Sequence, residues 1–332
     1  MIVEQPVSSL FAEYLEKCGL RPASVAYKRR ACDLFIKWFG DLPVKQVAPA
    51  TIEGYRAMLR KTGRKPHGRS QVSVRGYLDN FRPFWRWLRD NGHIDRDPFA
   101  GIRIKVDELP RREGFTRAEI SLLLRASKPL ERLQNCLGLL GCRRGEMFNI
   151  QVRDIHLDVA CPYIMLAAKE ASAKTWPWGT KNHQIGLVAL PVIMEFDGLT
   201  VGLTAEIHQR MTDLAMDPEG YLCLPRERVD KMLEWQREGV LRWEQISDPY
   251  GNFGGRFRQL QRRAGVRRTK RFHELRAAFT TSMFDANMPV TRVAKAVRHQ
   301  NIQTTMKYDR KSDMSLVADV AQIAASAYVS KC

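Results

Sequence analysis

The segment from Ser70 to Asp90 has a very regular apolar pattern that constrains its fold. Large apolar side chains recur there at intervals of four, three and four residues: Tyr77, Phe81, Phe84 and Leu88. Because an α-helix turns once in about 3.6 residues, this spacing puts the four side chains on one face. The sequence therefore predicts an amphipathic helix that buries this face, and Asn91-Gly92 predicts its end.

A second face of this helix is polar and almost entirely basic. It carries Arg75, Asp79, Arg82, Arg86 and Arg89. Between positions 55 and 89 the sequence has ten basic residues and one acidic residue, whereas an ordinary solvated face mixes the two signs. A simple solvent-facing surface remains an alternative for a single helix. We favour the interpretation that the four arginines contact phosphate groups.

The whole chain is strongly basic, which indicates a polyanionic partner. Its 332 residues include 54 Lys and Arg against 36 Asp and Glu, giving a formal net charge of +18. Charge alone leaves DNA, RNA and an anionic membrane surface open. No apolar run approaches the roughly 20 residues that span a bilayer, and the N-terminus lacks the apolar core of a signal peptide. Nucleic acid is therefore the favoured partner, and no membrane association is expected.

The cysteines indicate a reducing compartment. The seven cysteines are scattered, and no two form a Cys-x-x-Cys pair. This pattern argues against a disulfide framework and against a zinc ribbon. We therefore expect a cytoplasmic protein. With DNA as its partner, it would be associated with a prokaryotic nucleoid or its equivalent.

The sequence predicts two domains in a mainly α protein with one small antiparallel β-sheet. Residues 7–105 read as helices with short polar joints, and a charged segment without clear periodicity, 106–113, is the predicted linker. The next helix starts after Thr116, which forms a capping-box pattern with Glu119. The resulting partition is a helical domain over 1–105 and a second domain over 114–332.

The second domain contains the predicted sheet. Residues 162–168 and 185–190 are the best strand candidates, and turn-forming residues at 176–181 between them favour a hairpin region. The tryptophans at 176 and 178 are expected to pack within this hairpin rather than to stack on bases. After Pro191 the pattern returns to helix, and 247–255 is expected to be a loop.

Four short motifs carry residues suited to chemistry on a phosphodiester. They read Gly141-Cys-Arg143-Arg-Gly-Glu146, Thr180-Lys181, His273-Glu-Leu-Arg276 and Val297-Arg-His299 through Tyr308. Two guanidinium groups can hold non-bridging phosphate oxygens and stabilise charge in a pentacovalent transition state. A tyrosine hydroxyl, whose free pKa is near 10, can attack phosphorus once a base and positive charge assist it. Lysine or histidine can protonate the departing oxygen.

These residue types are poor metal ligands as a group. The motif His-Glu-x-x-His is incomplete, because position 277 is not histidine, and no Gly-rich phosphate loop is present. We therefore expect neither a metal site nor a cofactor. Each motif alone is common by chance, but all four occur in order and with their internal spacings met.

With these motifs the chain resembles the tyrosine recombinases of the phage integrase family, and the match is ordered along most of its length. The resemblance implies that Arg143 and Arg276 clamp the scissile phosphate. It makes Lys181 the general acid toward the 5′-oxygen, and it implies that His273 assists proton transfer near the nucleophile. His299 would bind the phosphate. Tyr308 would form a 3′-phosphotyrosyl bond.

The resemblance also implies roles for residues around this set. Glu146 would orient its neighbours. Residues 256–271 contain eight basic and no acidic residues, so we expect Arg262, Arg263, Arg267 and Arg268 to contact DNA. Two positions depart from the family pattern: Leu140 replaces the usual threonine, and Arg298 replaces the usual glycine. We expect Arg298 either to crowd the turn before His299 or to add a phosphate contact.

The implied function is site-specific recombination of double-stranded DNA without metal or ATP. Residues 1–105 would be a core-binding domain of the SAM-like kind, and 114–332 a catalytic domain that ends in a helix containing Leu316 and Val320. Four protomers on two DNA sites would exchange strands through a Holliday junction, as in the integration of a mobile element. Off DNA the protein would be a monomer or dimer. The alternatives are a DNA-binding relative that has lost catalysis and type IB topoisomerase-like relaxation.

Overall fold

The computed structural model describes residues 5–20, 22–63, 68–103, 114–180 and 185–309. The chain divides into two compact units, with the boundary between Arg111 and Arg112, and each is considered by itself. Three predicted features lie outside the described residues: the linker, Lys181 and the C-terminal helix. The predicted domain roles stay predictions.

The first unit is helical. Its elements are α1 (Val7–Lys17), α2 (Pro22–Phe39), the 3₁₀ turn η1 (Val44–Gln46), α3 (Pro49–Lys61) and α4 (Gln71–Asp90). Helix α4 confirms the helix predicted from the apolar spacing, and Phe81, Phe84 and Leu88 are fully buried. The helix ends at Asp90 with Asn91 as its C-cap, and Gly92 follows with φ +75°, a conformation that glycine adopts without strain.

An aromatic cluster forms the core of this unit. Phe35, Tyr55 and Trp85 surround Phe81 with ring centroids 5.3 to 5.9 Å from it, mostly at steep interplanar angles that suit aromatic pairs. The Tyr55 hydroxyl donates to the Ala31 carbonyl at 2.7 Å, so its polar end is satisfied within the core. The regular apolar face of α4 thus joins three neighbouring helices.

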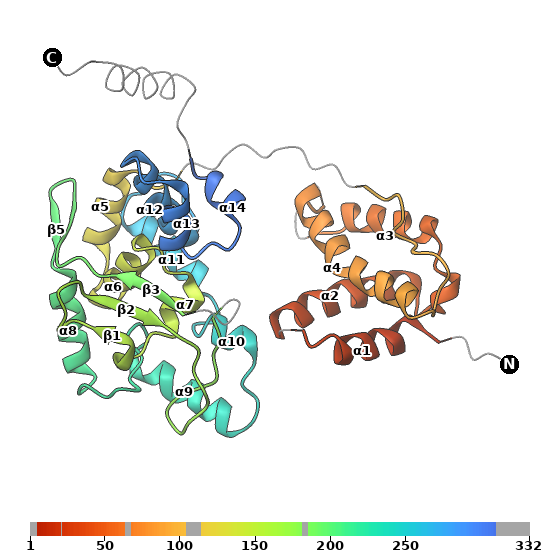
Figure 1. Cartoon of the computed structure of the whole chain (residues 1–332), viewed down its shortest axis with the longest axis horizontal. Helices are drawn as coiled ribbons and strands as arrows, with labels where there is room; N and C mark the ends of the chain where they lie inside the picture. The colour runs from red at the N-terminus through yellow and green to blue at the C-terminus, as the bar shows by residue number, and fades with distance from the viewer. Residues whose placement is uncertain (1–4, 21, 64–67, 104–113, 181–184, 310–332) are drawn as a thin grey trace, which may run out of the picture. The chain divides into compact units, whose positions relative to one another are not determined.

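The second unit contains the remaining helices. They are α5 (Arg117–Ala126), α6 (Pro129–Leu139), α7 (Arg144–Phe148), η2 (Val152–Asp154), α8 (Leu203–Asp213), α9 (Arg226–Arg237), α10 (Trp243–Ser247), α11 (Phe253–Arg263), α12 (His273–Asp285), α13 (Val290–Ala296) and α14 (Ile302–Met306). Helix α5 begins after the predicted capping box, in which Thr116 and Glu119 bond reciprocally. Helix α12 packs on α6 and α13 (Figure 1).

A three-stranded antiparallel sheet confirms the predicted hairpin. Its strands are β1 (Ile155–His156), β2 (Tyr163–Leu166) and β3 (Gly186–Ala189), in the order β1-β2-β3. Ile164 pairs with Val188, and both side chains are buried. Strand β3 lies at the edge of this sheet, and the side chain of Leu187 in it is exposed. The predicted class, mainly α with antiparallel sheet, is confirmed.

Two details of the prediction were wrong. A second hairpin, β4 (Met194–Phe196) and β5 (Leu199–Val201), precedes α8, where the sequence predicted helix directly after Pro191. Asp197 and Gly198 form its turn with φ +28° and +75°, and its strands are too short to show a clear alternation. The predicted loop at 247–255 is also shorter, because α11 already begins at Phe253. The Asn252 side chain caps this helix by accepting from the Gly255 amide at 3.1 Å.

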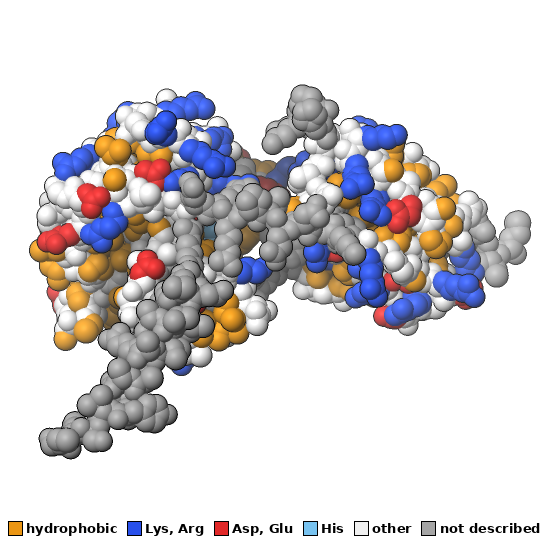
Figure 2. Space-filling view, turned by 90° about the horizontal axis from the view of Figure 1, so that it is seen from above, with side chains coloured by type: hydrophobic (Ala, Val, Ile, Leu, Met, Phe, Trp, Pro, Cys, Tyr) orange, Lys and Arg blue, Asp and Glu red, His pale blue; other side chains and the backbone are white. Residues whose placement is uncertain are grey.

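Among the described residues, no helix combines the length and the apolar character that crossing a bilayer requires. Lys and Arg side chains are spread over the visible face of each unit (Figure 2). This distribution agrees with the high net charge of the sequence.

Candidate active site

Arg143 stands at the start of α7, where the helix entry fixes its side chain. Its guanidinium Nη1 donates to Glu146 Oε1 at 2.5 Å, and its backbone amide donates to Glu146 Oε2 at 2.8 Å. Its other nitrogen, Nη2, donates to the carbonyl of Arg298 at 2.8 Å. The side chain remains 30 % exposed, so it can reach a substrate from a fixed position.

Arg276 lies deeper, on the first turn of α12, and is 1 % exposed. Its guanidinium donates to two backbone carbonyls, those of Gly141 and Val297. Burial, followed by the positive charges of Arg143 and Arg298, lowers the pKa of Arg276 to about 9. The group is still cationic at neutral pH, so it contributes a buried positive charge behind Arg143.

Tyr308 and His273 meet at the mouth of this site. The Tyr308 hydroxyl lies 3.3 Å from His273 Nε2, although the residues are 35 positions apart. Partial desolvation, and then the charges of Arg276 and Arg143, lower the pKa of His273. The pKa of Tyr308 is raised, because desolvation outweighs the opposing effect of the guanidinium groups. A neutral His273 can therefore accept the proton that Tyr308 must lose.

His299 lies beside Tyr308, with the ring centroids 5.9 Å apart. Its Nδ1 is 2.9 Å from the buried Thr305 hydroxyl, which orients the ring. Desolvation, followed by the nearby positive charges, lowers the pKa of His299 to about 4. The imidazole is therefore neutral at physiological pH and can take part in hydrogen bonds to an anion.

The described residues thus bring together Arg143, Glu146, His273, Arg276, His299 and Tyr308 from the ends of α7, α12 and α14 and the turn before α14. Lys181 lies outside the described residues. Arg298, which the sequence left open between two roles, enters this cluster from the α13–α14 turn. Its 13 % exposed side chain reaches Glu146 at 2.9 Å.

One buried ion pair was not predicted from the sequence. Lys169 and Asp154 form a buried ion pair at 2.7 Å, with side chains 3 % and 7 % exposed. The backbone of Lys169 pairs with that of Trp178 in both directions, at 2.8 and 3.0 Å. The pair thus ties the segment that precedes Thr180 to the end of η2. No periodicity in the sequence marks it. Its only sequence signal is a lysine in the chain between the two predicted strands.

The predicted DNA-contact arginines differ in their exposure and in their bonding partners. In the first unit Arg75 pairs with Asp79 and Arg89 pairs with Asp90, both on the surface. Arg82 is partly buried and donates to the Ile102 carbonyl at 2.8 Å, so it also serves the fold. Arg86 is exposed. Contact of these four side chains with DNA stays a prediction.

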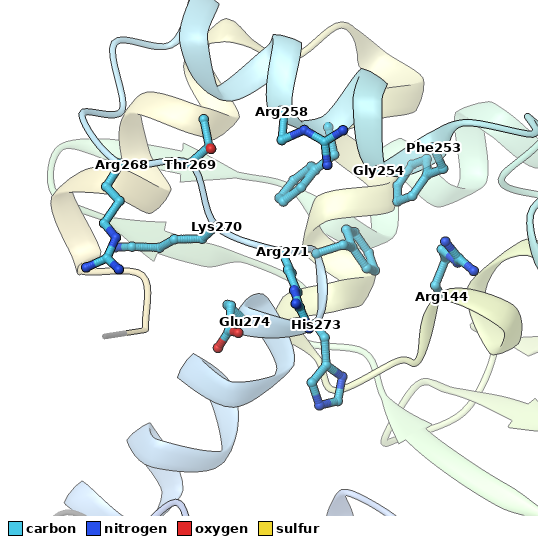
Figure 3. A pocket seen from close by; sticks show the side chains of 12 residues that line it. Arg144, Phe253, Gly254, Arg258, Arg268, Thr269, Lys270, Arg271, His273 and Glu274 are labelled. Atoms are coloured by element: carbon cyan, nitrogen blue, oxygen red, sulfur yellow. The ribbon is translucent and has the colours of Figure 1, made fainter. Parts of the chain in front are cut away.

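In the second unit all four predicted arginines are exposed: Arg262, Arg263, Arg267 and Arg268. Arg263 is also held by Glu131, at 2.6 Å. Beside His273 lies a pocket of about 640 Å³ between α11 and the start of α12. Figure 3 shows Arg258, Arg268 and Arg271 around it, with Glu274 as an acidic member. A basic surface therefore adjoins the candidate site.

No group of three or more His, Cys, Asp or Glu side chains that could hold a metal occurs in the part of the chain that the structure describes. The site itself offers three guanidinium groups, two imidazoles, one phenol and one carboxylate. This set favours an anionic substrate and proton transfer.

Residues 223–314 match the model of the phage integrase family. This part of the chain is a phage integrase domain. A curated relative, the tyrosine recombinase XerC of Oceanobacillus iheyensis, is 25% identical over 178 residues. That alignment covers 51% of this chain and 57% of the relative, so the match spans little more than half of either protein. The resemblance to tyrosine recombinases seen in the motifs is confirmed.

Solved structures of integrases share the fold of the chain. The Tn1549 transposon integrase, in complex with a circular intermediate DNA, matches with a TM-score of 0.68 at 13% identity, covering 95% of this chain and 98% of that one. A lambda integrase dimer bound to a COC′ core site matches with a TM-score of 0.63 at 15% identity, covering 93% and 99%. At this identity the likeness concerns the fold.

Proposed function

We propose that this protein is a site-specific DNA recombinase that cuts and rejoins strands through a covalent bond to Tyr308. The observation that carries the proposal is the approach of the Tyr308 hydroxyl to His273 beside Arg143 and the buried Arg276. His273, Arg276 and Tyr308 lie within the residues that match the phage integrase family model, and Arg143 joins them from an earlier part of the sequence. The combination supplies a nucleophile, a base and fixed positive charge.

In the proposed first step, the Tyr308 oxygen attacks the scissile phosphorus. The new P–O bond forms as the bond to the 5′-oxygen breaks, and the phenolic proton passes to His273. Lys181 protonates the departing 5′-oxygen in the role that the family resemblance gives it. Because one phosphate ester replaces another, the 3′-phosphotyrosyl bond keeps the energy needed for rejoining, and neither metal nor ATP is required.

The arginines stabilise the charge that builds on the phosphate. Arg143 is fixed by Glu146 yet partly exposed, which suits direct contact with a non-bridging oxygen. Arg276 has its donors on backbone carbonyls and acts as buried positive charge close behind. His299 adds a hydrogen bond to the phosphate, and Thr305 orients its ring.

The proposed substrate is double-stranded DNA, held by basic side chains of both units. The second unit offers the basic surface beside His273 (Figure 3). The first unit offers Arg86 and its neighbours on α4. Four protomers would assemble on two DNA sites and pass through a Holliday junction, in keeping with an integrase that moves a genetic element.

Covalent trapping tests this proposal. Nicked DNA fragments from the protein's own genomic neighbourhood are incubated with wild type and with Tyr308→Phe, denatured, and examined for DNA linked to protein. We expect adducts with wild type only. Arg117→Gln, which removes one exposed arginine ion-paired with Asp197, is the charge control and should form adducts normally. Salt-dependent binding with no adduct would instead indicate a DNA-binding relative without catalysis.

Relaxation assays separate recombination from topoisomerase activity. The proposal predicts cleavage at a preferred sequence and joining between two such sites. Relaxation of supercoiled DNA by monomers, without preference for a sequence, would favour the type IB topoisomerase alternative.

A further inference from the structure

Arg298 has a backbone conformation that is unfavourable for arginine. Its φ is +56°, in the left-handed region where the Cβ of a non-glycine residue is crowded. Its amide still donates to the Lys295 carbonyl at 3.0 Å, so the turn after α13 is well formed. Such a conformation persists only when the surroundings stabilise it, and it is often found at functional sites.

The side chain of Arg298 supplies that stabilisation. It is 13 % exposed, and its Nη2 donates to the Gly141 carbonyl at 2.7 Å and to Glu146 Oε2 at 2.9 Å. Its Nη1 donates to the Leu187 carbonyl of β3 at 3.3 Å. One guanidinium group therefore connects the turn before α14, the start of α7 and the edge strand β3 of the β2–β3 hairpin.

The stem of Arg298 packs closely against Gly186 in β3. A Cβ added at Gly186 would lie 2.3 Å from Arg298 Cδ, which is far closer than real contacts allow. The bare backbone of β3 at this point thus makes room for the arginine stem. A side chain at position 186 would therefore require Arg298 to shift from this position.

Arg298 also fixes Arg143 in two ways. Its backbone carbonyl accepts from Arg143 Nη2 at 2.8 Å, and its side chain holds the other oxygen of Glu146. Glu146, with a side chain 7 % exposed, is shared between the two guanidinium groups. Without the Arg298 side chain, Glu146 would keep only its bonds to Arg143, from the guanidinium to Oε1 and from the backbone amide to Oε2, and would lose its second guanidinium.

We propose that Arg298 is a positioning residue for strand cleavage, which holds Arg143 through Glu146 and through its own backbone carbonyl and ties β3 to this centre. The proposal rests on the proposed recombinase function and extends it. Arg298 acts on the substrate through Arg143, so its loss affects the chemical step more than the binding of DNA.

The test compares Arg298→Gly and Arg298→Lys with wild type and with the charge control Arg117→Gln. The measurements are the single-turnover rate of adduct formation at saturating protein and, separately, the affinity for the same nicked DNA. A misplaced catalytic group costs on the order of 100-fold in rate. We expect a loss of about that size for Arg298→Gly with little change in affinity, and an intermediate rate for Arg298→Lys.

Two outcomes would overturn the proposal. One is an Arg298→Gly protein that cleaves at the wild-type rate. The other is a loss of affinity as large as the loss of rate, which would make Arg298 a simple phosphate contact. If the glycine variant does not fold, the cleavage rate of Arg298→Lys tests the proposal, because lysine keeps the charge but not the forked set of donors.

A measurement without DNA separates this inference from the proposed function. Desolvation lowers the pKa of His299 most, and the charges of Arg276, Arg143, His273 and Arg298 lower it further. Proton titration of His299 by NMR in wild type and in Arg298→Gly should show a higher pKa in the variant. An unchanged pKa would contradict the placement of Arg298. Absence of adducts in wild type would contradict the proposed function and leave the titration to decide the placement of Arg298.

Discussion

The buried ion pair of Lys169 and Asp154 gives a sharp prediction about stability. Lys169→Met would remove the ammonium group and leave the Asp154 carboxylate buried. The only other donor to Asp154 in the described residues is the Gln151 amide, at 2.8 Å. Removing one partner of a buried pair costs about 3 to 5 kcal/mol, because the remaining charge is neither hydrated nor paired.

A surface pair of the same length provides the control. Lys231 and Glu234 on α9 also lie 2.7 Å apart, but their side chains are 47 % and 44 % exposed. Exposed pairs contribute at most about 1 kcal/mol, so Lys231→Met should cost far less. The two N–O distances are equal, so the difference between the two variants reports chiefly on burial.

Urea unfolding followed by tryptophan fluorescence measures these costs. Trp178 lies close to the ammonium group, with its ring centroid 5.8 Å away, and reports on this part of the unit. Asp154→Asn combined with Lys169→Met should recover about 1 to 3 kcal/mol relative to Lys169→Met alone. The reasoning would be refuted if Lys169→Met were no more destabilising than Lys231→Met.

Three further predictions follow from the same contacts. If neutral His273 is the base, the cleavage rate should fall on acidification only as His273 becomes protonated. Because the pKa of His273 is lowered, the midpoint of this fall should lie below pH 6.5, and activity should persist at mildly acidic pH. A cleavage rate that has already halved above pH 6.5 as the pH is lowered would contradict this. Trp176→Leu should lower the free energy of unfolding by about 2 to 4 kcal/mol, because it leaves a cavity and removes the 2.7 Å hydrogen bond to Asn149. A loss under about 1 kcal/mol would show that neighbouring side chains close the cavity. Gly138→Ala should lower the midpoint of thermal unfolding, because its Cβ would lie 2.8 Å from the Phe272 ring and overpacking costs about 1 to 3 kcal/mol. A raised midpoint would mean that the higher helix propensity of alanine outweighs the overpacking.

Much of the fold was predictable because it depends on local patterns. The spacing of Phe81, Phe84 and Leu88 predicted α4, and these side chains are buried on one face. The capping box at Thr116 predicted the start of α5. The β4–β5 hairpin was missed because strands of three residues show too little alternation to be separated from a helix start.

The residues of the site were predictable from motif order, but the contacts that hold them were not. His273 and Tyr308 were expected together, and their atoms lie 3.3 Å apart. The burial of Arg276 and the pairing of Lys169 with Asp154 depend on tertiary packing, which no spacing rule encodes. Arg298 could be noticed as a departure at a glycine position, but only the structure shows that its side chain turns inward to Glu146.

The central claim is that Tyr308 is the nucleophile that attacks DNA. It is tested most directly by digesting a trapped complex with protease and nuclease and locating the attached nucleotide by mass spectrometry. We predict a single modified peptide, with a 3′-linked nucleotide on Tyr308. A nucleotide on any other residue, or one joined through its 5′-phosphate, would contradict it.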